Sequence, residues 1–344
     1  MTEPSEARDL SVHLLAAEHR PAVLELASDP TWAVHNYLRI FGSDAAGVEQ
    51  RDRVERSLGC GAHLVAVAGG QVVGFVGWQR NEDLSHHFDV AVHETGPLLV
   101  HPASDRHQVA SMLLAAVRDD VAARGGGLVV HRSDAQDATA LAAAQDQGFA
   151  VRDVLLTFIN DLERSGRNAG VPDSFPHIEV VELDGRTDWL TDDDVTRLRV
   201  GAQYLVHDHY HRDPLLDDDR CDQLYLRLLD RSIAGEGADV AVVYRHTGAL
   251  LGVGFWRTNR ALEALGVSLA DGSFGLRLPG GPPEVVSDEF SSFICNRPIV
   301  GNRILEWSTH ATNLSQVNMT TRERSIRLCR SAVTLHCWTG PTSG

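Results

Sequence analysis

The stretch GPLLVHPASDRHQVASMLLAAV, from Gly96 to Val117, indicates the fold of the chain. Its apolar run, Pro97–Val100, predicts a strand that ends at His101-Pro102 and is followed by a polar loop over residues 103–108. From Val109 onward, apolar residues recur at helical spacing, which predicts a helix. A loop that leads into a helix N-terminus presents unpaired N–H groups and the positive end of the helix dipole. Such a loop is a candidate phosphate site, and an ordinary strand-to-helix connection is the alternative.

The composition limits the classes of protein to consider. The chain has 344 residues, 43% of them hydrophobic, which predicts two domains. Its net charge of −16 argues against a nucleic-acid partner. The polar N-terminus and the absence of a long apolar run predict neither a signal peptide nor a membrane span. Five scattered cysteines without a CxxC pair favour the reducing cytoplasm, and frequent Ala, Arg, Gly and Asp residues are typical of a bacterial protein. No pattern indicates an oligomeric state.

A duplicated hairpin predicts two domains of one kind. Residues 62–78 form two β-rich runs around Gly69-Gly70, and residues 238–257 repeat the pattern as ADVAVVYR, a short turn and ALLGVGFWR. We therefore expect an α/β (α+β) chain of two tandem domains, each a mixed, mostly antiparallel sheet flanked by helices. The expected domains are 1–162 and 177–344, joined by a polar linker, 163–176, that contains two Gly and two Pro.

Hydrophobic periodicity supplies the remaining elements. Residues 80–95 are expected to form a loop. Helices are expected over residues 31–41, 48–58, 137–147, 192–204, 218–233 and 287–296. Strands are expected over residues 127–132, 154–161, 178–185, 272–281, 304–309 and 331–338.

The first half resembles the GNAT N-acyltransferase superfamily. The resemblance covers about residues 10–162 and includes Pro102, Ala110 and Leu113-Leu114 in the order of the GNAT cofactor motif. Asp105 stands where that motif usually has Arg or Gln, and Gln108 stands where it usually has Gly. The resemblance implies direct transfer of an acyl group from acetyl-CoA or another acyl-CoA to an amine, without a metal. GNAT enzymes often protonate the leaving thiolate with a Tyr, but the corresponding residue is Ala144.

The resemblance also implies site residues in the first half. Glu94 is a candidate catalytic base, and a solvated loop carboxylate is the alternative. Main-chain groups at the end of the predicted strand would contact the pantetheine arm, and the start of the predicted helix would hold the pyrophosphate. These cofactor-binding candidates are Leu99, Val100, His101, Arg106, His107, Gln108, Val109, Ala110 and Ser111.

The second half resembles, in fewer residues, the bacterial dTDP-amino-sugar N-acetyltransferases. The fragment HYHRDPLLDDDRCDQLYLRLLDRSIAGEGADVAVV, from His209, and the terminal TLHCW carry this resemblance, which implies a small polar amine such as an amino sugar as acceptor. No cofactor loop is recognisable in this half. The nearest fragment, NRPIVGNRIL (296–305), ends too close to Asn313 for a helix and a further strand, so we interpret Ile304–Thr309 as the fifth strand.

Polar residues of the second half are candidates for the acceptor site. His209 and Glu306 are candidate catalytic residues, because an imidazole or a carboxylate can take the proton of an amine. Surface exposure, helix capping and, for the HxHxH pattern, a metal are the alternatives for the run around His209. The candidate substrate residues are Tyr210, Asp213, Trp307, Thr309 and Asn313.

Three functions remain open at this point. The first is a CoA-dependent N-acyltransferase, with acyl-CoA bound by the N-terminal domain and the small amine by the C-terminal domain. The second is an acyltransferase or decarboxylase that acts on carrier-protein or malonyl thioesters. The third is a non-catalytic binding protein of the same fold.

Overall fold

The computed structural model describes residues 9–41, 44–163, 178–183, 188–278, 302–322 and 325–340. Its contacts divide the chain into two compact units. Unit 1 comprises Met1–Val154 and Ser331–Gly344, and unit 2 comprises Leu155–Arg330. In these described ranges, no helix has both the length and the hydropathy needed to cross a membrane.

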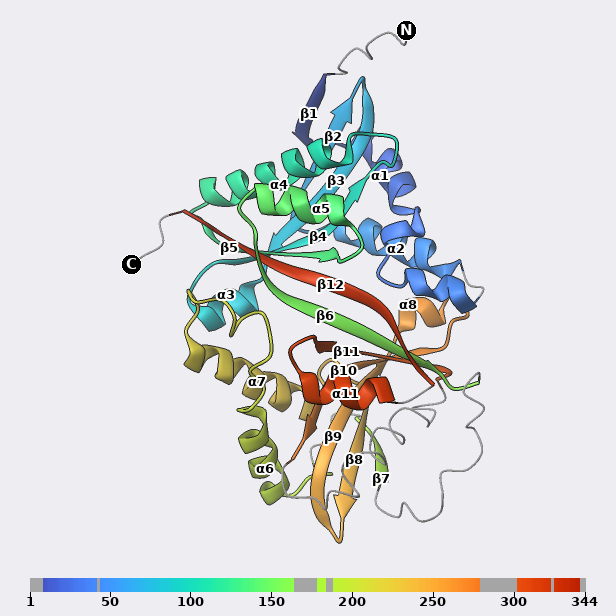
Figure 1. The fold of residues 1–344 in the computed structure, drawn as a ribbon, viewed down its shortest axis with the longest axis vertical. Coiled ribbons are helices and arrows are strands. Elements are labelled where there is room, and N and C mark those ends of the chain that lie inside the picture. The colour runs from blue at the N-terminus through green and yellow to red at the C-terminus, as the bar shows by residue number, and fades with distance from the viewer. Residues whose placement is uncertain are drawn as a thin grey trace. The chain divides into compact units, whose positions relative to one another are not determined.

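Unit 1 contains a mixed sheet in which only one pair of neighbouring strands, β4 and β5, is parallel (Figure 1). Its strands, in the order in which they lie in the sheet, are β1 (Leu10–Leu14), β2 (Ala62–Ala68), β3 (Gln71–Arg80), β4 (Val92–Val100), β5 (Gly127–Asp134) and the C-terminal part of β12 (Ile326–Thr339). Its α-helices are α1 (Arg20–Ala27), α2 (Ala45–Ser57), α3 (Glu82–Phe88), α4 (Arg106–Ala123) and α5 (Ala138–Asp146). Three short 3₁₀ helices, Ala17–His19, Pro30–Trp32 and Asn36–Phe41, complete it.

Alternate strand residues build two apolar layers on this sheet. On one face, Val76 and other strand residues pack against the apolar face of α4 and against Ala144 of α5. On the other face, Phe75 packs against residues of α1 and α2. Gly74 of β3 permits the close approach of α4, because a Cβ at this position would lie 2.5 Å from Cγ1 of Val109.

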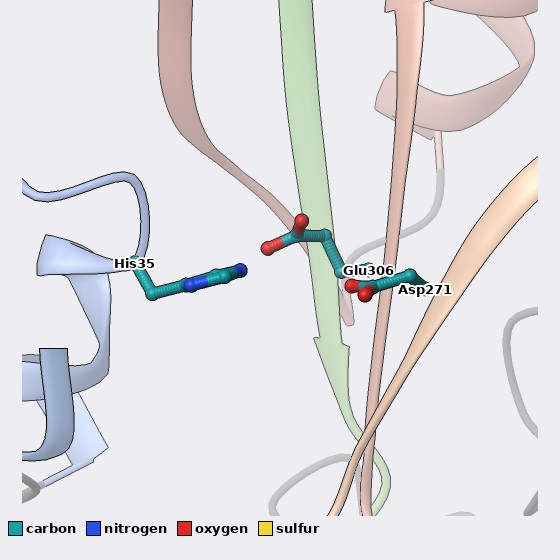
Figure 2. Close-up of side chains that lie close together, drawn as sticks. All are labelled: His35, Asp271 and Glu306. Carbon is teal, nitrogen blue, oxygen red and sulfur yellow. The ribbon is translucent and has the colours of Figure 1, made fainter. Parts of the chain in front are cut away.

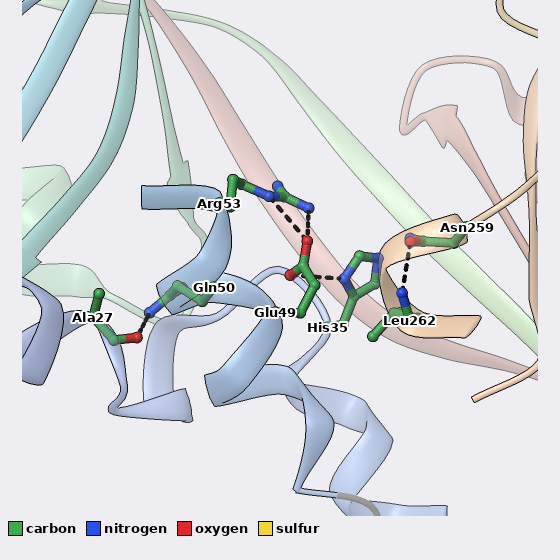
Figure 3. A network of polar contacts seen from close by, with 7 residues as sticks. All are labelled: Ala27, His35, Glu49, Gln50, Arg53, Asn259 and Leu262. Atoms are coloured by element: carbon green, nitrogen blue, oxygen red, sulfur yellow. Dashed lines mark hydrogen bonds and ion pairs between the residues drawn. The ribbon is translucent and has the colours of Figure 1, made fainter. Parts of the chain in front are cut away.

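Unit 2 repeats this arrangement. Its strands, in the order of the sheet, are β6 (Ala150–Asp161, from Leu155 onward), β11 (Ile304–His310), β10 (Leu269–Arg277), β9 (Ala249–Thr258), β8 (Val240–His246) and β7 (Ile178–Glu182). Only β10 and β11 pair in parallel. The described helices are α6 (Asp192–Ala202), α7 (Asp218–Ile233), α8 (Arg260–Glu263) and α11 (Leu314–Arg322). Figure 3 shows the N-cap of α8, where the Asn259 side chain accepts from the amide of Leu262 at 3.2 Å.

The structure confirms the expected fold class and both hairpins, which are β2–β3 and β8–β9. The units differ from the expected domains, 1–162 and 177–344, in two segments. Residues Leu155–Asp161 pair with β11 of unit 2, and Ala332–Thr339 pair with β5 of unit 1. Each half of the sequence therefore supplies the last strand of the other unit's sheet.

Several local predictions need correction. Residues 80–95 do not form a loop, because Asn81 caps α3 by accepting from the amide of Leu84 at 3.0 Å, and β4 already begins at Val92. The prediction that Ile304–Thr309 is a strand is confirmed by β11. The predicted helix over 287–296 and the linker beyond Glu163 lie outside the described residues.

Candidate functional site: an opening between two parallel strands

Each unit has one pair of parallel strands, β4 and β5 in unit 1 and β10 and β11 in unit 2. In both units the two strands pair over a short distance and then separate. In unit 2, β10 and β11 pair from Leu269 with Ile304 to Gly272 with Trp307. The pairing of β10 with β9 shifts in register between Gly272 and Phe274. This shift is a β-bulge, which leaves an extra residue, Ser273, outside the ladder and bends the strand. The bulge lies where the parallel pairing ends, so it separates the two strands.

A cavity of about 360 Å³ lies at this separation, within unit 2. Its walls come from the end of α6 and the loop that follows, from β9, β10 and β11, and from α11. Leu276 belongs to the apolar layer under α6 and α7, whereas Trp256 and Trp307 belong to the layer on the opposite face. The cavity therefore contacts side chains from both faces of the sheet.

Glycines and tryptophans form one wall of the cavity. The strand register places Gly272 beside Trp256 and Gly275 beside Gly254. A Cβ at Gly272 would lie 3.1 Å from Cβ of Trp307, whereas a Cβ at Gly275 would meet, among the described residues that do not adjoin it, just the carbonyl oxygen of Val253, at 3.8 Å. Gly272 thus permits close packing of the aromatic wall, and Gly275 leaves space in the cavity.

A smaller hollow of about 260 Å³ shares residues with this cavity. It is lined by Arg277 at the end of β10 and by Ser315, Asn318, Met319 and Arg322 of α11. Arg277 is exposed, and partial desolvation by its neighbours lowers its pKa from the ordinary value. Within the described part of the chain, no ion pair joins Arg277 or Arg322 to a carboxylate. Two arginine side chains at one place favour an anion there.

The loop between α6 and α7 brings His207 to the cavity wall. Asp208 fixes this loop, because its carboxylate accepts from the amides of Tyr210 and His211 at 2.6 and 3.1 Å and also contacts the His211 ring. The other ring nitrogen of His211, Nε2, lies 3.1 Å from Oδ1 of Asp222. Burial by itself would lower the pKa of His211, but the two carboxylates raise it above its ordinary value.

The structure places the predicted acceptor residues at different depths. Trp307, Thr309 and Asn313 line the cavity. Tyr210 and His209 are buried in the loop with ring centroids 3.9 Å apart, and neither lines the cavity. The carboxylate of Asp213, also buried, accepts from the amide of Leu215 at 3.1 Å. Glu306 lies on β11 opposite Asp271 of β10, as Figure 2 shows.

In unit 1, the groups expected to face a phosphate already have partners. Asp105 caps α4 by accepting from the amide of Gln108 at 3.0 Å. Arg106 forms an ion pair of 2.7 Å with Asp137, and Nε2 of His107 lies 3.0 Å from a carboxylate oxygen of Asp146. The capping carboxylate uses a helix N–H and adds a negative charge where a phosphate would need a positive one.

The other N-terminal candidates lie on β4 and at the start of α4. Glu94 was expected in a loop before the strand, but it lies within β4. Its carboxylate accepts a hydrogen bond from the side-chain amide of Asn81 at 2.9 Å. Leu99, Val109 and Ala110 are buried, and the amide of His101 donates to the carbonyl of Val73 at 2.9 Å. Val100 ends β4, and Ser111 lies in α4 with a buried hydroxyl.

The separation of β4 and β5 in unit 1 contains a histidine. Parallel pairing ends at Glu94 with Val130, and the next pair of side chains, Thr95 and His131, is joined by a hydrogen bond of 2.8 Å. Burial lowers the pKa of His131 to about 4, and the ring of Phe149 lies 6.0 Å away. His131 is therefore neutral at physiological pH and packs as part of the core.

A polar cluster that the sequence analysis did not select stabilises the helices of unit 1. Figure 3 shows buried Glu49 between Arg53, with which it forms an ion pair, and His35, whose Nδ1 lies 3.4 Å away. Burial alone would raise the pKa of Glu49, but the contacts with His35 and Arg53 lower it below its ordinary value. This carboxylate is therefore ionised in the folded protein near neutral pH.

Comparison with known proteins agrees with this geometry. Residues 31–149 match the model of the acetyltransferase (GNAT) family. The chain is similar in structure to a GCN5-related N-acetyltransferase from Sphaerobacter thermophilus, with a TM-score of 0.58, 11% identity and 96% of each chain covered. It is also similar to a tandem GNAT protein from the clavulanic acid biosynthesis pathway, with a TM-score of 0.53, 17% identity, and 97% of this chain and 99% of that one covered. No curated protein matches the chain.

These similarities define the class of the fold. The chain is a mixed α/β protein whose fold is found in tandem GNAT proteins, and its segment 31–149 carries the sequence pattern of the GNAT acetyltransferases. At such low identities the structural similarity establishes the fold alone. The resemblance of the second half to amino-sugar N-acetyltransferases stays a prediction.

Sequence reasoning missed the glycine wall, Arg277 and the helix α11. The segment GVGFW of the second hairpin, which corresponds to GFVGW of the first, was a signal for part of the wall. Gly254 and Trp256 of this segment line the cavity. Asn313 was a signal for α11, because its side chain accepts from the amide of Gln316 at 3.2 Å. Asp105, three residues before Gln108, was likewise a signal for the N-cap of α4, because its carboxylate accepts from the amide of Gln108.

Proposed function

We propose that the protein is a CoA-dependent N-acyltransferase that transfers an acyl group, with acetyl as the simplest case, from acyl-CoA to the amine of a small polar acceptor. We place the reaction in the cavity between β10 and β11. The observation that carries the proposal is that this cavity contacts side chains of both faces of the sheet. The donor and the acceptor can then approach the same point from opposite sides.

The residues of the cavity suit acyl-CoA. Gly275 leaves space beside the strand for a narrow chain such as the pantetheine arm. Arg277 and Arg322 supply positive charge at the adjoining hollow, which suits the phosphates of CoA despite the net charge of −16. The expectation that residues 96–117 bind acyl-CoA stays a prediction, and the experiments below compare the two places.

The chemistry requires few groups. The amine must lose a proton, and we assign this role to His207, acting directly or through a water molecule. Main-chain N–H groups at the bulge around Ser273 polarise the thioester carbonyl. The new N–C bond forms as the C–S bond breaks, and the thiolate of CoA leaves and takes up a proton.

The lining of the cavity favours a polar acceptor. Hydrogen-bonding side chains lie beside the aromatic wall of the cavity. They are Ser308 and Thr309 of β11, Asn313 after it, Ser273 and His207. Such a lining suits hydroxyl groups around an amine. An amino sugar, suggested by the sequence around His209, remains our proposal for the acceptor class.

Release of CoA from acetyl-CoA in the presence of a panel of small polar amines, amino sugars included, tests the function. We expect release that depends on one class of amine. We also expect His207→Ala to lower kcat by about 10²- to 10⁴-fold, as loss of a general base does, with little change in acetyl-CoA affinity.

Other outcomes identify the alternative functions. Acetyl-CoA binding without CoA release across the panel would contradict acyl transfer to an amine and favour a binding protein. Release of CO₂ from malonyl-CoA without an amine would favour a decarboxylase.

A further inference from the structure

Trp256, in the wall of the cavity, has a buried indole N–H donor without a hydrogen-bond partner among the described residues. Trp256 lies on β9, lines the cavity and is only 4% exposed. Its Nε1 is buried and has no hydrogen-bond partner among the described residues. A buried donor without a partner costs free energy, because it gives up water and gains nothing in return. Such a group in a cavity wall indicates that a ligand completes it.

Gly254 keeps the space beside this donor open. A Cβ built on Gly254 would lie 3.2 Å from Nε1 and 4.0 Å from Cδ1 of Trp256. Apart from the adjoining residues, these are the only atoms that it would meet within 4 Å in the described part of the chain. Both residues line the cavity. A side chain at position 254 would therefore press against the N–H edge of the indole, which glycine leaves uncovered on this side.

We infer that the indole N–H of Trp256 donates a hydrogen bond to a carbonyl oxygen of the acyl-CoA bound in this cavity, and that Gly254 keeps the place of that oxygen free. The inference rests on the proposed function only for the identity of the ligand. An indole is an uncharged donor without an acceptor, so it suits a neutral carbonyl. Acyl-CoA carries such oxygens in its thioester and in the two amides of its pantetheine arm.

The indole N–H resonances of the full-length protein test this contact directly. The chain has six tryptophans, and the Trp256 signal is the one that Trp256→Phe removes. We expect its proton resonance to move downfield when the protein is saturated with acetyl-CoA. A shift with CoA as well as acetyl-CoA assigns the oxygen to a pantetheine amide, and a shift with acetyl-CoA alone assigns it to the thioester. An unshifted Trp256 signal in a protein that binds acetyl-CoA overturns the inference.

Affinity measurements with matched variants supply a second test. Trp256→Phe should weaken acetyl-CoA binding about tenfold in calorimetric titrations, as expected for the loss of one hydrogen bond in a closed site. Trp189→Phe is the control, because Trp189 is also in unit 2 and its buried Nε1 also has no partner among the described residues, but it does not line the cavity. Equal affinities of the two variants would contradict the inference.

Gly254→Ala tests the side of the ring on which the N–H lies. It retains the indole and its N–H but places a methyl group in the space beside them. Because the ring has to shift to accommodate a carbon 3.2 Å from Nε1, we expect weaker acetyl-CoA binding together with a small loss of thermal stability. If acetyl-CoA does not bind the unmodified protein, the proposed function fails. Normal binding that is unchanged by Gly254→Ala and Trp256→Phe refutes only the role of Trp256.

Discussion

Replacement of Gly275 by valine should stabilise unit 2 and weaken acyl-CoA binding. Gly275 lies in β10 on the cavity wall, and its first new contact would be the carbonyl oxygen of Val253 at an ordinary 3.8 Å. Glycine within a strand costs about 0.5–1 kcal/mol relative to alanine, and valine favours strands. We therefore expect the free energy of unfolding in urea to rise by about 0.5–1 kcal/mol.

The same side chain should take up space that acyl-CoA needs. Forcing extra carbon atoms into a filled site costs about 1–3 kcal/mol. At about 1.4 kcal/mol for each factor of ten, the dissociation constant of acetyl-CoA should rise about 5- to 150-fold in calorimetric titrations. Opposite signs for stability and binding distinguish this effect from damage to the fold.

Gly96→Val is the matched control. Gly96 lies in β4 of unit 1, next to the register shift of that strand, and in the described part of the chain a Cβ there would meet just the carbonyl oxygen of Gly77, at 3.6 Å, apart from adjoining residues. We expect it to leave acetyl-CoA affinity unchanged. Normal affinity in Gly275→Val would refute the placement of acyl-CoA between β10 and β11, and a loss confined to Gly96→Val would favour the N-terminal site instead.

Three further predictions concern the hollow, the loop and the core. Arg277→Ala should weaken acetyl-CoA binding by at least about tenfold, as loss of a charged hydrogen bond does, and should reduce its salt dependence; an unchanged salt dependence would contradict a phosphate contact. His211→Gln should lower the free energy of unfolding more at about pH 6 than at about pH 9. The raised pKa of His211 gives stability that is complete below its ordinary pKa and is lost as pH rises through the raised value, so a pH-independent difference would refute this role. Gly74→Ala should destabilise the protein by about 1–3 kcal/mol in urea unfolding, since its Cβ overlaps Val109; unchanged stability would contradict the close packing of α4.

Local chemistry made part of the fold predictable. The Gly69-Gly70 turn determined the first hairpin, and both of its glycines have positive φ, 56° and 78°, in the structure. The short distance between residue 305 and Asn313 correctly predicted a strand, β11. These features depend on neighbours in the sequence, which is why the sequence alone was enough for them.

Long-range pairing was not predictable in the same way. The runs 154–161 and 331–338 both have the pattern of a buried strand, and nothing in that pattern states which sheet each one joins. The structure pairs the first run with β11 and the second with β5. The register shift at Ser273, on which the cavity depends, also results from tertiary pairing.

Only part of the cavity lining could be selected from the sequence, because the rest depends on long-range contacts. Trp307, Thr309 and Asn313 were selected because they lie on a recognisable strand and its exit; all three line the cavity, and their role in binding stays a prediction. Arg277 and Trp256 were not selected, because each lies in an apolar strand. Arg277 joins a candidate site through its contact with α11, which is distant in the sequence, and Trp256 through Gly254, which has no side chain to signal it. Charge and space at a site arise from such combinations rather than from a motif.

Hydrogen–deuterium exchange of the full-length protein, with and without acetyl-CoA, shows whether acyl-CoA binds between β10 and β11. It reports on the backbone of both units in one sample and needs no variant. We expect slower exchange in residues 272–277 of β10 and 313–320 around α11, with no comparable change in residues 96–117. Slower exchange confined to residues 96–117 would contradict this expectation and would place acyl-CoA in unit 1.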